Sequence, residues 1–304
     1  MRNRTLIFLV TLLFSISSLA SSKTRSCSFV FSNFSETLYN GTQKLTKSDS
    51  LSSRHVVSIG RKGAAAFFDN YSNLWQMAFD ADGCEAVLGK IIEGQDINTT
   101  EIALLKRVRK SGSALRNAFM VFDYRHEVPK DFEDFVIKFG KLNDLLALPW
   151  LTTDEMEEIH KLAGKIFEEI HERHSYLTHI TDEFQASKRE KLQEDLKEDS
   201  LAARKLVAHS KLNEEDQHRL RKIMRKFLYY QLAVYDTNPS EDNRMAYQLL
   251  YEISAEMGDN RDQFFGQIAE LKKRGAKIPK SLKKFSISDS LRREILTYLN
   301  FIQI

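Results

Sequence analysis

Proline and glycine are scarce in this chain of 304 residues, which has four prolines and twelve glycines. Sandwiches, barrels and doubly wound sheets need a turn about every ten residues, and turns draw on these two residue types. The scarcity therefore excludes those classes and predicts an all-α protein. Disorder is excluded as well, because 42% of the residues are apolar and the chain is long enough to bury a core.

Motifs of common catalytic chemistry are also missing. The chain contains no Gly-x-Ser-x-Gly elbow, no glycine-rich phosphate-binding loop and no His-Glu-x-x-His zinc motif. The paired Glu-x-Glu-x-Lys strand motif of triphosphatases is not present either. We therefore predict that the protein is not an enzyme and needs no cofactor.

One acidic segment offers a competing interpretation as a metal centre. Glu157-Glu-Ile-His160 recurs as Glu168-Glu-Ile-His171, and Glu-x-x-His is the spacing that di-iron bundles use. Such bundles draw these motifs from different helices, whereas both copies here fall on one predicted helix. We therefore interpret the segment as a polar surface and predict no metal site.

The first twenty residues have the layout of a secretory signal peptide. Arg2 and Arg4 precede the apolar run Leu6–Phe14, and small residues follow up to Ala20. We expect cleavage after Ala20 and an exported protein, periplasmic or extracellular. The alternative is a retained membrane anchor, but the run is shorter than the roughly 20 residues that span a bilayer. The mature chain should therefore have no membrane span.

Only two cysteines are present, Cys27 and Cys84. Export would place them in an oxidising compartment, where a disulfide between them becomes possible. Two unrelated thiols are the alternative, which the sequence leaves open.

Capping signals and prolines divide the chain into helices after an irregular lead-in over residues 21–50. Asn98 with Glu101, and Thr152 with Glu155, have the spacing of capping boxes. Pro129 suits the start of a helix. We predict helices over residues 53–79, 82–93, 99–124, 130–147, 153–198, 200–209, 214–236, 240–257, 260–274 and 288–301.

A segment of thirteen residues without an acid, 218–230, is the most informative part of the chain. At about 100° per residue in a helix, its cationic side chains fall on one face with Tyr229, and its apolar side chains fall on the other. The cationic face holds His218, Arg221, Lys222 and Arg225, and the apolar face holds Leu220, Ile223, Met224, Phe227 and the later Val234. Most such charged faces are merely solvated.

A shift of 112 residues aligns Lys106-Arg-Val-Arg-Lys110 with His218-Arg-Leu-Arg-Lys222. The first copy keeps an apolar face through Val108, Leu115, Phe119 and Phe122. A glycine lies four residues before an aspartate later in each copy, at Gly140 and Gly258. We interpret this pattern as a twofold internal repeat of helical hairpins, with halves at about 51–198 and 199–304.

The pattern His-x-x-Arg-x-x-x-Arg-Lys, followed by an apolar helix and Gly-x-x-Arg-Asp, resembles the CHAD family, the conserved histidine α-helical domain. The resemblance is good over 214–274 and weaker over 99–147. It implies two pseudo-symmetric four-helix bundles that enclose a basic channel for inorganic polyphosphate. By position, His218, Arg221, Arg225 and Lys226, with Arg109 and Lys110, would line the channel.

The first copy departs from the family pattern. Lys106 replaces the histidine, and Ser113 and Ala114 replace basic residues. We call the cationic faces of the two copies the two cationic stripes. With their flanking lysines included, the predicted anion-binding residues are His218, Arg221, Lys222, Arg225, Lys226, Lys106, Arg109 and Lys110.

Two functions follow as hypotheses. The protein binds a phosphate-rich polyanion such as inorganic polyphosphate, or it is a structural or adaptor protein of the cell envelope that kept the scaffold and lost anion binding. The net charge of +3 gives no reason to expect specific nucleic acid binding.

Overall fold

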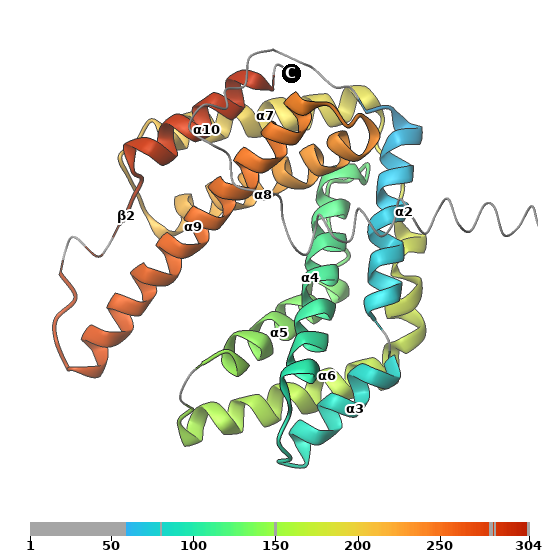
Figure 1. The fold of residues 1–304 in the computed structure, drawn as a ribbon, viewed down its shortest axis with the longest axis vertical. Helices are drawn as coiled ribbons and strands as arrows, with labels where there is room; N and C mark the ends of the chain where they lie inside the picture. The colour runs from blue at the N-terminus through green and yellow to red at the C-terminus, as the bar shows by residue number, and fades with distance from the viewer. Residues whose placement is uncertain (1–58, 80, 149–150, 280–281, 283, 303–304) are drawn as a thin grey trace, which may run out of the picture. The chain divides into compact units, whose positions relative to one another are not determined.

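The all-α prediction is confirmed by a computed structural model, which describes residues 59–79, 81–148, 151–279, 282 and 284–302. All of them lie within the unit Gln43–Ile304. In this part of the chain the elements are α2 (Arg61–Ala78), α3 (Ala81–Ile92), α4 (Thr99–Phe122), α5 (Lys130–Leu146), α6 (Thr153–His179), the 3-10 helix η1 (Ile180–Glu183), α7 (Arg189–Val207), β1 (Lys211–Leu212), α8 (Glu214–Thr237), α9 (Glu241–Lys273), β2 (Phe285–Ser286) and α10 (Asp289–Phe301) (Figure 1).

Local capping chemistry fixes where several helices begin. Asn98 caps α4, where its side chain accepts from the amide of Glu101 and the Glu101 carboxylate accepts from the amide of Asn98. Thr152 and Glu155 form the same reciprocal pair at α6, so both predicted capping boxes are confirmed. Pro129 is the N-cap of α5, one residue before its first helical position.

Helices α2 to α6 form the first helical group, in which α2 and α5 pack on α4, and α3 and α5 pack on α6. Its core is aromatic. Trp75 of α2 is fully buried, and its indole Nε1–H donates to the carbonyl of Leu177 in α6 over 2.8 Å. The edges of Phe132 and Phe135 meet the same indole at centroid distances of 5.3 and 6.2 Å, a favourable aromatic geometry.

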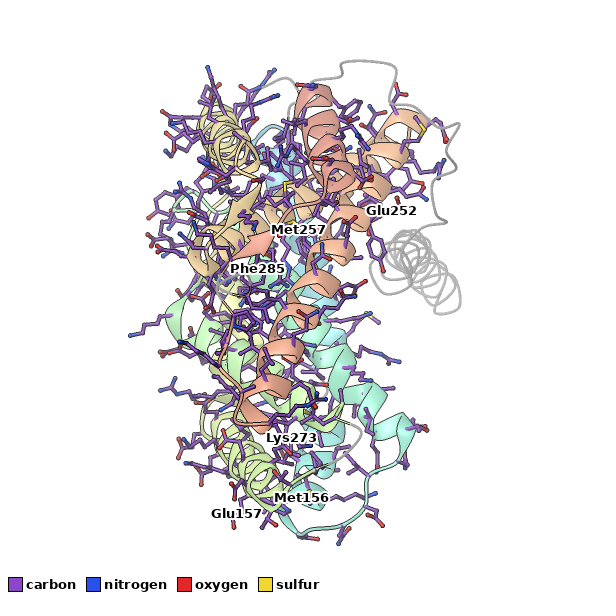
Figure 2. The ribbon with its side chains drawn as sticks, turned by 90° about the vertical axis from the view of Figure 1, so that its left-hand side faces the viewer. Met156, Glu157, Glu252, Met257, Lys273 and Phe285 are labelled. Carbon is purple, nitrogen blue, oxygen red and sulfur yellow. The ribbon has the colours of Figure 1, made fainter. Side chains whose placement is uncertain are left out.

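Helices α7 to α10 form the second helical group, in which α8 packs on α7 and α9, and α10 packs on α7 and α9. Strands β1 and β2 pair antiparallel. Phe285 of β2 lies against α9 (Figure 2), where its ring stacks on Phe264 at 3.9 Å between centroids. The contact anchors the chain that follows α9.

The two groups meet where α4 packs against α8 (Figure 1). At this junction Tyr71 of α2 donates a hydrogen bond to the carbonyl of Tyr229 in α8, and the two rings meet edge to face at 5.7 Å. The helices that carry the two predicted cationic stripes are therefore neighbours.

Several predicted boundaries differ from the structure. The predicted helix 153–198 is two helices, α6 and α7, separated by η1 and the extended residues 184–188, and α7 continues through the predicted break at 199. The predicted break at Gly258 is absent, because α9 runs unbroken from Glu241 to Lys273. Since α7 packs with α8 and α10, the second group begins at α7 rather than at residue 199.

The segment 184–188 is extended because the end of α4 captures its backbone. Ser187 donates its amide to the carbonyl of Phe122. The Asp123 carboxylate, whose residue is fully buried, accepts from the amide of Gln185. These hydrogen bonds compete with continuation of the helix beyond η1.

The predicted signal peptide, the lead-in and Cys27 lie outside the described residues. Cys84 is fully buried in α3. Because Cys27 is not among the described residues, the disulfide between them stays a prediction. Within the described part of the chain, none of the helices combines the length and the apolar character that crossing a bilayer requires.

Candidate anion-binding site

The cationic face of α8 has the predicted orientation. Leu220, Met224 and Phe227 are fully buried on the opposite side. His218, Lys222 and Arg225 are exposed, and Arg221 is half-buried. Amphipathic periodicity therefore located this face correctly from the sequence.

Helix α4 contributes cations to the same place. Arg109 and Arg116 of α4 are close enough to Arg225 that their charges help to lower its pKa, after the main cause, which is desolvation of this exposed side chain by its many neighbours. Arg109 was predicted from the sequence, but Arg116 was not. Of the predicted cations on α4, Arg109 thus lies near the cationic face of α8, across the contact between the two helices.

Helix α9 supplies a further cation, Arg261, which also acts on Arg225. Its guanidinium lies over the ring of Phe265, 5.0 Å from the centroid, and forms an ion pair with Asp262 at 3.4 Å. Sequence reasoning missed Arg261 as a site residue, although it belongs to the Gly-x-x-Arg-Asp segment that carries the family resemblance.

We call this set the cationic cluster. It joins side chains of α4, α8 and α9: Arg109, Arg116, His218, Arg221, Lys222, Arg225 and Arg261.

Burial and mutual repulsion perturb the cluster in the direction expected for crowded cations. Burial, followed by the charges of Arg225 and Arg261, lowers the pKa of Arg221 to about 10. That value is still far above neutrality, so the guanidinium stays charged. Partly desolvated cations attract an anion more strongly than fully hydrated ones, because the local dielectric constant is lower.

Two carboxylates form ion pairs with members of the cluster. Asp144 lies 3.0 Å from Arg109, and Asp262 lies 3.4 Å from Arg261. These pairs leave the cluster with a clear excess of positive charge, because it holds six arginine and lysine side chains.

Polar groups border the cluster at the junction of the two helical groups. The charges of Arg225 and Arg116 act on the phenol of Tyr229, and a hydrogen bond with Asn117 favours its ionised form, although burial raises its pKa overall. The buried Nε of Arg116 has no hydrogen-bond partner among the described residues. An unsatisfied buried donor costs about 1–3 kcal/mol, so an anion oxygen that reached this atom would be bound favourably.

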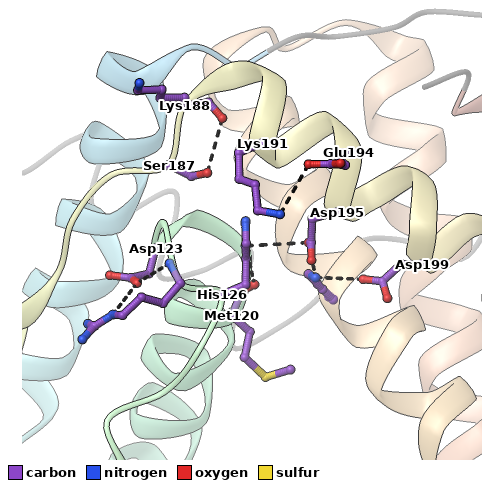
Figure 3. A network of polar contacts seen from close by, with 11 residues as sticks. Met120, Asp123, His126, Ser187, Lys188, Lys191, Glu194, Asp195 and Asp199 are labelled. Atoms are coloured by element: carbon purple, nitrogen blue, oxygen red, sulfur yellow. Dashed lines mark hydrogen bonds and ion pairs between the residues drawn. The ribbon is translucent and has the colours of Figure 1, made fainter.

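The structure argues against Lys226 as an anion-binding residue. Its residue is 7% exposed, and its ammonium forms ion pairs with Asp195 and with Asp199, the latter at 2.8 Å, both on α7. His126 lies 3.7 Å from Asp195 in the same network (Figure 3). Lys226 therefore holds α8 against α7 and turns away from the cluster.

Lys106 and Lys110 have exposed side chains on α4. They are not among the leading charges that act on His218, Arg221 or Arg225. The structure therefore supports Arg109 more strongly than these two lysines as the contribution of the first repeat.

The histidines of α6 do not build a metal centre with the nearby carboxylates. His171 and His174 are exposed. Among the described residues, no three His, Cys, Asp or Glu side chains gather into a group that could hold a metal ion.

No protein-family model, curated protein or solved structure matches this chain. The CHAD resemblance therefore stays a prediction from the sequence motifs, and the proposals below rest on the geometry of the cluster.

Proposed function

We propose that the protein binds a phosphate-rich polyanion, such as inorganic polyphosphate, at the cationic cluster without altering it chemically. The observation that supports this most directly is the gathering of Arg109, Arg116, Arg221, Arg225 and Arg261 from three helices. Like charges repel, so their gathering favours a ligand of opposite charge.

The preference for arginine in the cluster suits phosphate. A guanidinium is planar and can donate two parallel hydrogen bonds to two oxygens of one phosphate. Lys222 adds a mobile point charge, and the exposed His218 adds a nitrogen donor. Repeated phosphates would satisfy more members of the cluster at once than a single small anion can reach.

Binding of fluorescently labelled long-chain polyphosphate, measured by anisotropy at two salt concentrations, tests the proposal. In the variant Arg221→Ala/Arg225→Ala we expect affinity to fall at least tenfold, because a hydrogen bond to a charged group contributes about 1.5–3 kcal/mol. The slope of log affinity against log salt should also become shallower, by about 0.7 for each lost phosphate contact.

A matched control removes the same charge elsewhere. Lys197 and Lys205 of α7 have exposed side chains, so Lys197→Ala/Lys205→Ala lowers the net charge equally and should bind almost as the wild type does. Equal loss in both variants would indicate a nonspecific charge effect. Absence of binding by the wild type in dilute buffer would favour the structural or adaptor function instead.

A further inference from the structure

We propose that binding of the polyanion takes up a proton at His218, so that affinity rises as the pH falls through the range around neutrality. This inference rests on the proposed function and adds a form of regulation to the same site. It depends on where the imidazole lies among the cations of the cluster.

His218 lies at the N-terminal end of the cationic face of α8. Arg221, Lys222 and Arg225 follow it by three, four and seven residues, and these intervals return to one side of a helix. Arg261 approaches from α9. The imidazole is exposed, so an anion held by these side chains can reach it.

The charged surroundings of His218 come from α8 itself and from every element packed against α8. The first turn of α8 carries three acids, and α7 carries two carboxylates that pair with the buried Lys226. Those groups are, on α8, Glu214, Glu215 and Asp216; on α9, Arg261 and Asp262; on α4, Arg109 and Arg116; on β1, Lys211; and on α7, Asp195 and Asp199.

Partial desolvation and the neighbouring cations act in the same direction on the imidazole. Partial desolvation by neighbouring side chains, and then the charges of Lys222, Arg221, Arg261 and Arg225, lower the pKa of the exposed His218 from its ordinary value of 6.5. Before an anion binds, these surroundings therefore favour the neutral form of the ring.

A bound polyanion offsets the effect of the neighbouring cations on the imidazole. Its negative charge offsets the neighbouring cations and favours the imidazolium, whose two N–H groups can both donate to phosphate oxygens. Since binding favours protonation, protonation favours binding by the same factor. The imidazole of His218 has one pKa in the free protein and a higher one in the complex with the polyanion. Between these two pKa values, the affinity for the polyanion can rise by up to about tenfold for each unit of decrease in pH.

The test measures binding of polyvinyl sulfonate from pH 8.5 to pH 5.5, because its sulfonates stay ionised throughout this range. For the wild type we expect the dissociation constant to fall by about threefold to tenfold. His218→Gln, which cannot be protonated, should bind with little pH dependence, and His218→Lys should bind tightly at every pH. His209→Gln, which changes an exposed histidine outside the cluster, should keep the wild-type slope.

Calorimetry in two buffers of different ionisation enthalpy gives a second readout, the number of protons taken up on binding. At pH 6.5 we expect a fraction of a proton for the wild type, and that fraction should disappear in His218→Gln. Binding with equal pH slopes in the wild type and His218→Gln would overturn the linkage but leave polyanion binding intact. Failure of every variant to bind at any pH would overturn polyanion binding itself.

Discussion

Replacement of Lys226 by alanine should destabilise the fold and leave the anion-binding face intact. The substitution removes the ammonium that pairs with Asp195 and Asp199 across the contact between α7 and α8. Two carboxylates would then face each other without a cation. Truncation of one partner of a fully buried ion pair costs about 3–5 kcal/mol.

The exposure of the partners sets the expected magnitude. The side chain of Lys226 is 9% exposed, whereas those of Asp195 and Asp199 are 20% and 24% exposed. Water can therefore solvate the orphaned carboxylates in part, and we expect a loss of about 2–4 kcal/mol at pH 7.5. Lys226→Met, which keeps the apolar stem, should cost less than Lys226→Ala because it loses the charge but little packing.

The loss of stability caused by Lys226→Ala should depend on pH. Burial raises the pKa of Asp199, and the charge of Lys226 opposes that rise. Without the ammonium the pKa rises further, so the carboxyl group becomes neutral more readily as the medium is acidified. The difference in stability between wild type and Lys226→Ala should therefore be smaller at pH 5 than at pH 7.5.

Urea unfolding followed by circular dichroism at both pH values measures these differences. Lys222→Ala is the matched control, because Lys222 lies one turn earlier on α8 with an exposed side chain. It should change stability by less than about 0.5 kcal/mol while weakening polyphosphate binding. The reasoning is refuted if Lys226→Ala unfolds at the wild-type urea concentration, or if it weakens binding as much as Arg225→Ala does.

Two further predictions concern packing and a buried acid. Gly112→Ala should lower the free energy of unfolding by about 1–3 kcal/mol, because the added Cβ would lie 3.1 Å from both Trp75 and Val136. The control Gly164→Ala has open space around its Cβ. It should raise the free energy of unfolding, measured in thermal melts, by about 0.5–1 kcal/mol. Since burial raises the pKa of Asp199 above 3.8, wild-type stability falls as the pH rises through the raised value. Asp199→Asn should therefore gain stability relative to the wild type between pH 4 and pH 7, and a relative loss in melts at those pH values would contradict this.

Helix boundaries were predictable where the chemistry that sets them is local. The capping boxes at Asn98 and Thr152 consist of side chains three residues apart, so the sequence contains the whole interaction. The end of α6 depends instead on Asp123 and Phe122, some sixty residues away in the sequence, which bind the extended segment. Gly258 did not break α9, because a helical glycine costs only about 1 kcal/mol and tertiary packing offsets that cost.

The site was predictable on α8 and only in part elsewhere. Periodicity placed Arg221 and Arg225 correctly, but it also places Lys226 about 100° away from Arg225, toward the packed side of the helix. Lys226 was assigned through the family resemblance, and its ion pairs with Asp195 and Asp199 of α7 are tertiary contacts that the sequence of α8 does not specify. Arg261 belongs to the Gly-x-x-Arg-Asp segment of the family resemblance, but its place beside the α8 cations depends on the packing of α9 on α8, which periodicity along one helix does not specify.

The junction between the two helical groups also has a mechanical consequence. Arg109 and Arg116 on one group face Arg225 on the other, so mutual repulsion works against the aromatic contact of Tyr71 with Tyr229 that holds the groups together. Dissolved multivalent anions would stabilise the junction between the two helical groups by neutralising the cations on both of them. The two helical groups should therefore separate most easily in solvent of very low ionic strength, whichever anion the protein binds.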